Sequence, residues 1–384
     1  MRIRRRLSYW LFLLTTMTLA CARSSPGGAP FTAPSAGPQE PATKEAAPYN
    51  AGLRILQASY VTRSGRVELL TMAVWYPTRD APRPFTYEME ESYRSTVAFE
   101  GTPAEAGRPF PLVVYSHGLY SSGYSLAVFG EHLARNGYVM VAPDYSDTAP
   151  PDYTEPTAFS QILTGPADAP VRVFANARRF VDAMNADPDL LLAYLAEHRL
   201  GQTRFVLDQA LGWNEDPASA FFQRIDAGRI GIAGWSLGGL TAIGLVGAHP
   251  DPAERDPRFD AALLLSAPPY PFQDTLGQIR VPIMLMTGDN DEANVGPQYP
   301  RSLVYAGAPP PKYHLVLDST THYDFGNRPA GSLPLDEAID RIPGLNAIAG
   351  YSLAFFDLYL RQDASAAARL DGSHPALDLY QEEE

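Results

Sequence analysis

The chain has 384 residues, of which 45% are hydrophobic, enough for one substantial core and more consistent with one large α/β domain than with two small ones. Its 30 basic and 43 acidic side chains give a formal net charge of −13, which argues against a nucleic-acid partner. A single cysteine excludes an intramolecular disulfide, so the fold must be stable without one.

The first twenty residues have the pattern of an export signal. Four arginines within residues 2–6 precede an apolar stretch, 7–19, that is too short for a comfortable membrane span. Small residues then lead to Cys21, and the segment resembles the lipobox of bacterial lipoproteins, with Thr18 where leucine is usual. We expect an exported protein: either a cell-envelope lipoprotein whose only membrane contact is a lipid anchor at Cys21, or a secreted or periplasmic protein.

The sequence predicts three further segments after the signal peptide. Residues 21–48 are rich in proline, alanine and serine without a hydrophobic period, which is typical of a flexible tether. Residues 49–378 carry the folded domain. The acidic residues at the end, 379–384, are expected to be solvated and frayed.

Short apolar runs and helical stretches alternate through the folded domain. Two β-rich runs, 54–61 and 66–76, predict an antiparallel hairpin, and the proline-rich residues 80–108 predict an excursion from the sheet. Later strands are expected at 111–116, 138–142, 260–266, 281–287 and 312–317. Because these runs are apolar on both faces, they indicate a mostly parallel central sheet covered by helices on either side.

The helices and one long loop complete the expected order. Residues 126–136 predict a helix closed by Gly137, residues 190–211 predict two helical stretches separated near Gly201, and residues 348–361 predict a closing helix. Residues 146–175 are irregular and rich in proline. A loop of that length is either a lid over the site or a surface insertion without function.

The sequence Gly234-Trp235-Ser236-Leu237-Gly238-Gly239 carries the strongest functional signal. The apolar run before it suits a buried strand, and residues 240–246 suit a buried helix. A G-x-S-x-G pattern between strand and helix is the nucleophile elbow, a sharp turn that presents a serine at the edge of the sheet. Ser236 is therefore the candidate nucleophile, and a serine that merely caps the helix is the alternative.

A serine hydroxyl needs a base within hydrogen-bond reach and a carboxylate that orients the base. His322 follows a predicted strand, at the edge where catalytic groups gather in α/β sheets, and is the candidate base. We expect structural roles for the other histidines after the elbow, which are His249, His314 and His374. Asp291 is the candidate acid, with Asp289, which is better placed to bond turn amides, as the second choice and Asp318 as the third.

Ester chemistry also needs donors for the oxyanion. The backbone N–H groups of Leu237 and Leu119 are the candidates, and His117 is expected to shape the loop that carries Leu119. Three aromatic residues are candidates for the pocket wall or for simple packing, namely Trp235, Tyr120 and Tyr145. The histidines are not spaced as a ligand set, so we expect no metal and no organic cofactor.

These motifs together resemble the α/β-hydrolase superfamily over residues 110–325. The resemblance rests on residues 111–119, 142–144, 204–208, 229–239 and 288–291, and is closest to the branch of platelet-activating-factor acetylhydrolases and dienelactone-hydrolase-like proteins. Dienelactone hydrolases have a cysteine nucleophile, whereas this chain has Ser236. The elbow is also similar to that of cutinase-like polyester hydrolases.

The resemblance implies an α/β-hydrolase fold and a serine carboxylic ester hydrolase acting on short-chain or lipid-like esters. A polyester hydrolase and a peptidase or amidase on the same triad are the alternatives, since all share the oxyanion chemistry. A surface binding protein with an idle triad is the non-enzymatic alternative.

Overall fold

The computed structural model describes residues 48–89, 91–119, 121–145, 186–291 and 300–384. The expected signal peptide, Cys21, the tether as far as residue 47 and the expected lid at 146–175 lie outside the described residues. Residues 47–384 form one compact unit. None of the helices that the structure describes is long and apolar enough to cross a membrane.

Within the described residues, eleven strands form one sheet in the order β11-β10-β9-β8-β7-β5-β6-β2-β1-β4-β3. The strands from β6 to β10 are parallel neighbours and make the mostly parallel centre that the sequence predicted. They are β5 (Phe110–Ser116), β6 (Val139–Pro143), β7 (Ile225–Trp235), β8 (Ala261–Leu265), β9 (Ile283–Gly288) and β10 (Lys312–Leu317). Their carboxyl ends meet at one edge of the sheet, where functional groups gather in α/β folds.

The hairpin of β1 (Asn50–Val61) and β2 (Val67–Thr78) joins the sheet through antiparallel pairing of β2 with β6. The expected excursion at 80–108 is wrong for much of its length, because β3 (Arg83–Tyr87) and β4 (Tyr93–Phe99) extend the sheet beyond the hairpin. Alternate side chains of β4, such as Ser95 and Val97, point inward and are buried. Proline and polar residues hide this alternation in the sequence.

The expected frayed tail is also wrong. Residues Leu377–Glu383 form β11, which pairs antiparallel with β10 at the edge of the sheet. Nζ of Lys312 lies 2.9 Å from a carboxylate oxygen of Glu383. The backbone of β11 pairs with β10 even though most side chains of β11 face solvent. Charged side chains on an edge strand protect it against pairing with another molecule.

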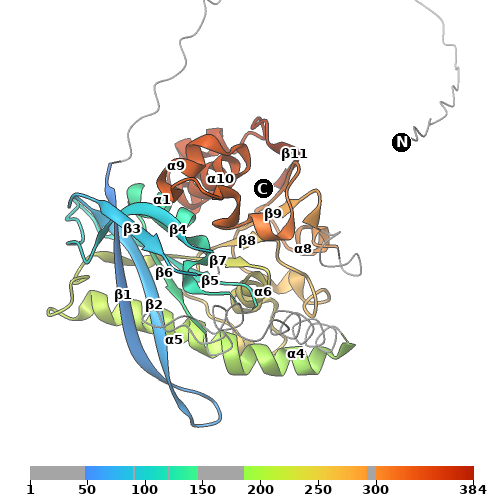
Figure 1. The fold of residues 1–384 in the computed structure, drawn as a ribbon. Helices are drawn as coiled ribbons and strands as arrows, with labels where there is room; N and C mark the ends of the chain where they lie inside the picture. Colours follow the sequence, from blue (N-terminus) through green and yellow to red (C-terminus); the bar gives the residue numbers. More distant parts are fainter. Residues whose placement is uncertain (1–47, 90, 120, 146–185, 292–299) are drawn as a thin grey trace, which may run out of the picture. The chain divides into compact units, whose positions relative to one another are not determined.

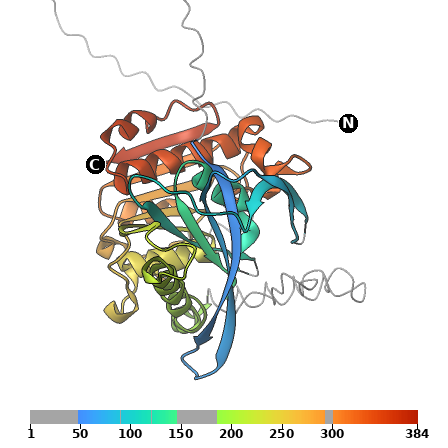
Figure 2. The ribbon, with the colours of Figure 1, turned by 90° about the vertical axis from the view of Figure 1, so that its left-hand side faces the viewer.

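Helices cover both faces of the sheet (Figures 1 and 2). One face packs against α1 (Ala127–Arg135), α9 (Leu335–Arg341) and α10 (Pro343–Tyr359). The other face packs against α4 (Pro188–Leu195), α5 (Gly201–Glu215) and α6 (Leu237–Ile243), with α8 (Ser302–Gly307) near β10. Successive side chains of a strand point to opposite faces of the sheet, and in β2 Trp75 packs on the first face and Tyr76 on the second.

The expected separation of two helices near Gly201 is wrong. The chain passes from α4 to α5 through a π-helical turn, Ala196–Leu200, and Gly201 itself has helical dihedral angles. A Cβ atom at Gly201 would lie 2.5 Å from the hydroxyl of Tyr60 in β1. Glycine leaves room for the Tyr60 hydroxyl of the hairpin close to the helix, and it does not end the helix.

Candidate active site

Ser236 lies in the turn between β7 and α6, at the carboxyl edge of the sheet. Its φ of 55° and ψ of −120° are rare for a residue with a side chain and cost about 1–3 kcal/mol. The backbone N–H of Ser236 donates to the carbonyl of Leu265 over 2.9 Å. A Cβ atom at Gly238 would fall on the carbonyl oxygen of Ser116, so only glycine lets β5 pack this closely on the elbow.

The structure brings together the three residues that the sequence singled out. Nε2 of His322 lies 3.0 Å from the hydroxyl oxygen of Ser236, and its Nδ1 lies 3.0 Å from Oδ1 of Asp291. His322 opens a short 3-10 turn, His322–Asp324, that is held by a capping box between Thr321 and Asp324. The arrangement is a hydroxyl, an imidazole and a buried carboxylate in series, as serine nucleophile chemistry requires.

The other candidates for base and acid lie elsewhere. His249 bonds the backbone of Asp251, His314 lies against Thr287, and His374 lies against Asn346. Oδ1 of Asp289 accepts the backbone N–H of Thr320 over 2.9 Å, a structural role like the one expected for it. The backbone N–H of Asp318 donates to the carbonyl of Ala376, on the side of β11.

Ser266 is a site residue that the sequence analysis missed. It follows β8, has a φ of 50°, and places its hydroxyl oxygen 2.5 Å from Nδ1 of His322. When Nε2 of His322 accepts the proton of Ser236, Nδ1 must carry the ring proton, and Ser266 and Asp291 both lie within reach of it. A hydrogen bond from Ser266 also stabilises the ionised Asp291. The serine thus supports the imidazole and the carboxylate together.

Arg301 is the second missed residue. Its Nε lies 3.3 Å from Oδ2 of Asp291 and donates to the carbonyl of Ser266 over 3.0 Å. One of its terminal nitrogens lies 3.3 Å from Nδ1 of His322. The arginine and the carboxylate are both buried, at 4% and 0% exposure, so the acid has an ionic partner in addition to its hydrogen bond with the histidine.

The surroundings shift the pKa values of the acid and the base. Burial raises the pKa of Asp291, but the hydrogen bonds from His322 and Ser266 and the charge of Arg301 outweigh it and bring the pKa below its usual range. Burial lowers the pKa of His322, and Arg301 lowers it further, against the opposing effect of Asp291. The imidazole therefore stays neutral, and able to accept a proton, to a lower pH than a free histidine.

The loop after β5 lies beside the elbow. A Cβ atom at Gly118 would lie 2.6 Å from the Trp235 ring, which shows how closely the two segments pack. Nδ1 of His117 faces the carbonyl of Gly118 at 2.7 Å, and its Nε2 accepts the backbone N–H of Tyr145 at 3.4 Å. Both ring nitrogens of His117 are thus directed at the backbone, and the ring shapes the loop that carries Leu119.

The aromatic candidates have different surroundings. Trp235 is partly exposed, and its indole N–H donates to the carbonyl of His322 over 2.8 Å. Tyr145 is 1% exposed, its hydroxyl pairs with Thr203, and its ring packs against His117, which favours simple packing, the alternative to a place on the pocket wall. Tyr120 lies outside the described residues.

Tyr323 is a further aromatic residue at the site, and the sequence analysis did not select it. It is 49% exposed, and its ring centroid lies 6.4 Å from that of Trp235. Its position directly after His322 in the sequence could have indicated that it lies at the site. Among the described residues, no cluster of histidine, cysteine and carboxylate side chains could hold a metal ion.

Comparison with known proteins agrees with the fold. Residues 192–328 match the model of a family described as PETase, PET hydrolase-like. The matched range contains Ser236, Asp291 and His322. A solved structure described as a ferulic acid esterase from Streptomyces cinnamoneus is similar with a TM-score of 0.59 and 21% identity, over 90% of this chain and 98% of that one. No curated protein matches the sequence.

The sheet order, the elbow and the structural similarity show that the chain has the α/β-hydrolase fold. The match to the PET hydrolase-like model indicates that it is a carboxylic ester hydrolase with a serine at the elbow.

Proposed function

We propose that the protein hydrolyses carboxylic esters through an acyl-enzyme on Ser236, with His322 as general base and acid and Asp291 as the orienting carboxylate. One observation carries the proposal: the hydroxyl of a positive-φ serine lies 3.0 Å from an imidazole that is itself 3.0 Å from a buried carboxylate. A serine that only capped α6 would need neither partner. No side-chain cap bond forms at Ser236.

The reaction follows from this geometry. Ser236 Oγ attacks the carbonyl carbon of the ester while Nε2 of His322 takes its proton. Collapse of the tetrahedral intermediate breaks the bond to the alcohol oxygen, which receives the proton from His322. Water then attacks the acyl-enzyme, again giving a proton to Nε2, and the carboxylic acid leaves as Ser236 is restored. Asp291 holds Nδ1–H toward itself throughout and stabilises the imidazolium.

The oxyanion is stabilised by the backbone N–H groups of Leu237 and Leu119 in this proposal. Leu237 is the first residue of α6, and an N–H in the first turn of a helix has no acceptor within the helix. The adjacent dipole of the helix favours negative charge at the same place. Leu119 follows Gly118 in the loop that packs on the elbow.

Two substrate classes fit the proposed site. Short-chain or lipid-like esters are the first, as in the acetylhydrolase-like branch. Polyesters are the second, and two observations support them: the match to the PET hydrolase-like model and the neighbouring Trp235 and Tyr323 rings, of which Tyr323 is half exposed. Aromatic rings of this kind can stack on an aromatic acid unit of a polymer.

The test uses the domain from Tyr49 onward and compares it with Ser236→Ala and with Ser332→Ala, which changes an exposed serine. We expect hydrolysis of p-nitrophenyl esters, acetate through laurate, and labelling by a fluorophosphonate, in the parent and in Ser332→Ala but not in Ser236→Ala. The chain-length profile and the release of acid from PET film distinguish the two substrate classes. Activity that persists in Ser236→Ala would overturn the assignment of the nucleophile.

We also propose that the chain is exported and anchored by acylation of Cys21, from the basic, apolar and small-residue order of its first residues. Incorporation of an alkyne-labelled fatty acid by the full chain, and its loss in Cys21→Ser, is the expected result. Secretion of the parent chain without label would favour plain cleavage of the signal peptide.

A further inference from the structure

A buried arginine contacts the loop after β5 from the helix α4–α5. Arg199 is 0% exposed and belongs to the π-helical turn that joins the two helices. One terminal nitrogen donates to the carbonyl of His117 over 2.6 Å, and the other donates to the carbonyl of Gly118 over 3.2 Å. A planar guanidinium with two fixed donors suits two successive carbonyls, and the ammonium of lysine does not.

Other contacts fix the guanidinium in place. Its central carbon lies 4.4 Å from the ring centroid of Tyr145, a cation–π contact. The hydroxyl of Thr203 donates to the carbonyl of Arg199 over 2.8 Å and pairs with the hydroxyl of Tyr145 at the same distance. Burial of a guanidinium is costly unless its N–H groups are satisfied, so these bonds are a condition for Arg199 being here. π-helical turns of this kind are frequent at functional sites.

The peptide geometry links these bonds to the oxyanion donor. In a trans peptide the carbonyl and the following N–H point in opposite directions. The Gly118 carbonyl points to Arg199. The N–H of Leu119, which belongs to the same peptide unit, is therefore directed away from Arg199. The bond from Arg199 helps to hold this peptide, together with the contacts that His117 Nδ1 and the backbone N–H of Ser121 make to the same carbonyl.

We propose that Arg199 is a positioning residue for the oxyanion hole: through the His117 and Gly118 carbonyls it fixes the direction of the Leu119 N–H. This inference rests on the proposed function, because it assumes that Leu119 N–H receives the oxyanion. Arg199 itself does not touch the reacting atoms. It acts by holding the Leu119 N–H in position before the negative charge develops. A donor that is already in position stabilises the oxyanion more strongly, because it need not reorganise during the reaction.

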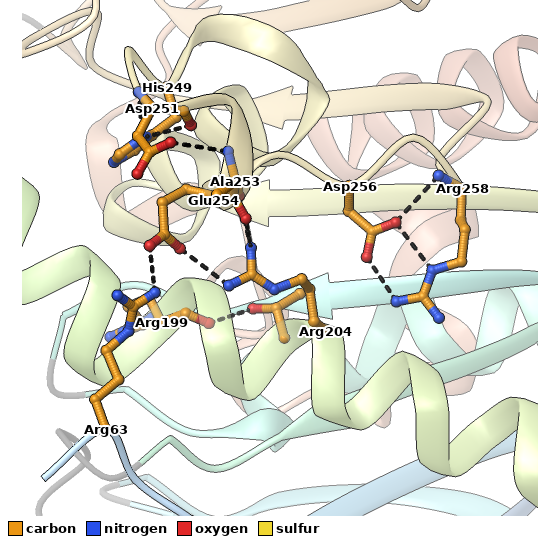
Figure 3. A network of polar contacts seen from close by, with 10 residues as sticks. Arg63, Arg199, Arg204, His249, Asp251, Ala253, Glu254, Asp256 and Arg258 are labelled. Atoms are coloured by element: carbon orange, nitrogen blue, oxygen red, sulfur yellow. Dashed lines mark hydrogen bonds and ion pairs between the residues drawn. The ribbon is translucent and has the colours of Figure 1, made fainter.

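The same helix offers a matched control (Figure 3). Arg204 lies five residues further along the helix and donates to the carbonyl and the carboxylate of Glu254, over 2.8 and 2.9 Å. Glu254 also pairs with Arg63 of the hairpin turn. This network ties the hairpin to the helix and to the segment after α6, so a change at Arg204 tests stability without touching the oxyanion loop.

The experiment measures kcat and KM on p-nitrophenyl acetate, and the inhibition constant of phenylboronic acid, for Arg199→Lys, Arg199→Met and Arg204→Met. The boronate forms a tetrahedral adduct with the nucleophile and so probes the oxyanion site. For both Arg199 variants we expect kcat to fall roughly 10- to 100-fold, the size expected when one oxyanion donor is loosened. KM should change little, and the boronate should bind more weakly by a similar factor.

The pH dependence of kcat/KM should be the same as in the parent, since the triad is untouched. Arg204→Met should lower the melting temperature but keep kcat. Arg199→Lys keeps the buried charge, so it can be used for the kinetic test if Arg199→Met does not fold. Two outcomes would overturn the role of Arg199. In the first, kcat of the folded Arg199 variants is within twofold of that of Arg204→Met. In the second, kcat/KM falls only because KM rises. Parent activity that Ser236→Ala also retains would overturn the proposed function, and this inference with it.

Discussion

The guanidinium of Arg301 lies behind the catalytic pair that we propose, with Nε 3.3 Å from Oδ2 of Asp291. In a Ser-His-Asp triad the carboxylate is hydrogen-bonded to Nδ1–H of the histidine. Here a buried cation faces the acid and also lies 3.3 Å from Nδ1 of the imidazole. The positive charge therefore favours ionised Asp291 and neutral His322 at once.

Removing this charge should shift the pH dependence of catalysis. Arg301 lowers the pKa of His322, so Arg301→Met should raise that pKa and move the acidic limb of kcat/KM to higher pH. Activity is then lost earlier as the pH falls. A pH profile of p-nitrophenyl acetate hydrolysis measures the shift. Arg280→Met removes an exposed arginine and should leave the profile in place.

Arg301→Met should also unfold more easily, by about 3 kcal/mol, because it leaves Asp291 buried without its ionic partner. Arg301→Lys keeps the charge and should shift the profile less. An acidic limb that is identical in parent, Arg301→Met and Arg301→Lys would contradict the electrostatic role.

Ser266→Ala should lower kcat about tenfold, or about 1.4 kcal/mol, because the hydroxyl that supports His322 and Asp291 is lost. The matched control is Ser352→Ala in α10, which also removes a fully buried hydroxyl but lies outside the site. Steady-state kinetics and thermal unfolding of both variants check the expectation. Equal kinetic constants for the two variants would show that Ser266 only packs.

Two glycine substitutions should have opposite effects on stability. A Cβ atom at Gly238 would collide with the backbone of Ser116, so Gly238→Ala should prevent the elbow from closing and yield little folded protein. Gly350 is an exposed residue of α10 with open space around its Cβ position. Gly350→Ala should stabilise by about 0.5–1 kcal/mol, since alanine has the higher helix propensity. Thermal unfolding measures both, and a folded, stable Gly238→Ala would refute the tight packing.

A chain that ends at Ala376 lacks β11 and exposes the edge of β10. We expect a lower melting temperature and a greater tendency to aggregate, because unpaired strand edges associate. The kinetic constants of the monomer at 25 °C should stay close to those of the parent, since β9 still pairs with the other side of β10. Removal of Glu384 alone, which lies beyond the strand, should have no effect. A melting temperature unchanged by the larger deletion would mean that β11 contributes no stability.

The centre of the fold could be predicted from the sequence because parallel strands are buried on both faces. Strands such as β6 and β9 are therefore continuous apolar runs. The strands at the margins could not be found in this way. β11 is largely exposed and charged, so the composition of residues 377–383 does not indicate a strand. The segment is a strand because the backbone groups of β10 need hydrogen-bond partners on that side.

The same limit applies to the site. The order Ser236, Asp291, His322 could be predicted because each residue follows its own strand, and the structure places them in contact. Arg199 and Ser266 could not, because their partners are distant in the sequence: 82 residues separate Arg199 from His117, and 56 separate Ser266 from His322. No local pattern marks a side chain whose role is set by a distant contact.

The positive φ angles of Ser236 and Ser266, 55° and 50°, occur at the ends of neighbouring strands, β7 and β8. Both residues take part in the chemistry that we propose, and glycine would take either conformation with less cost. Selection for thermal tolerance alone would therefore favour glycine at both positions, and the resulting protein would lose its activity. The serines persist only while turnover is under selection, so their replacement in a natural relative would mark a lineage in which this chemistry has been given up.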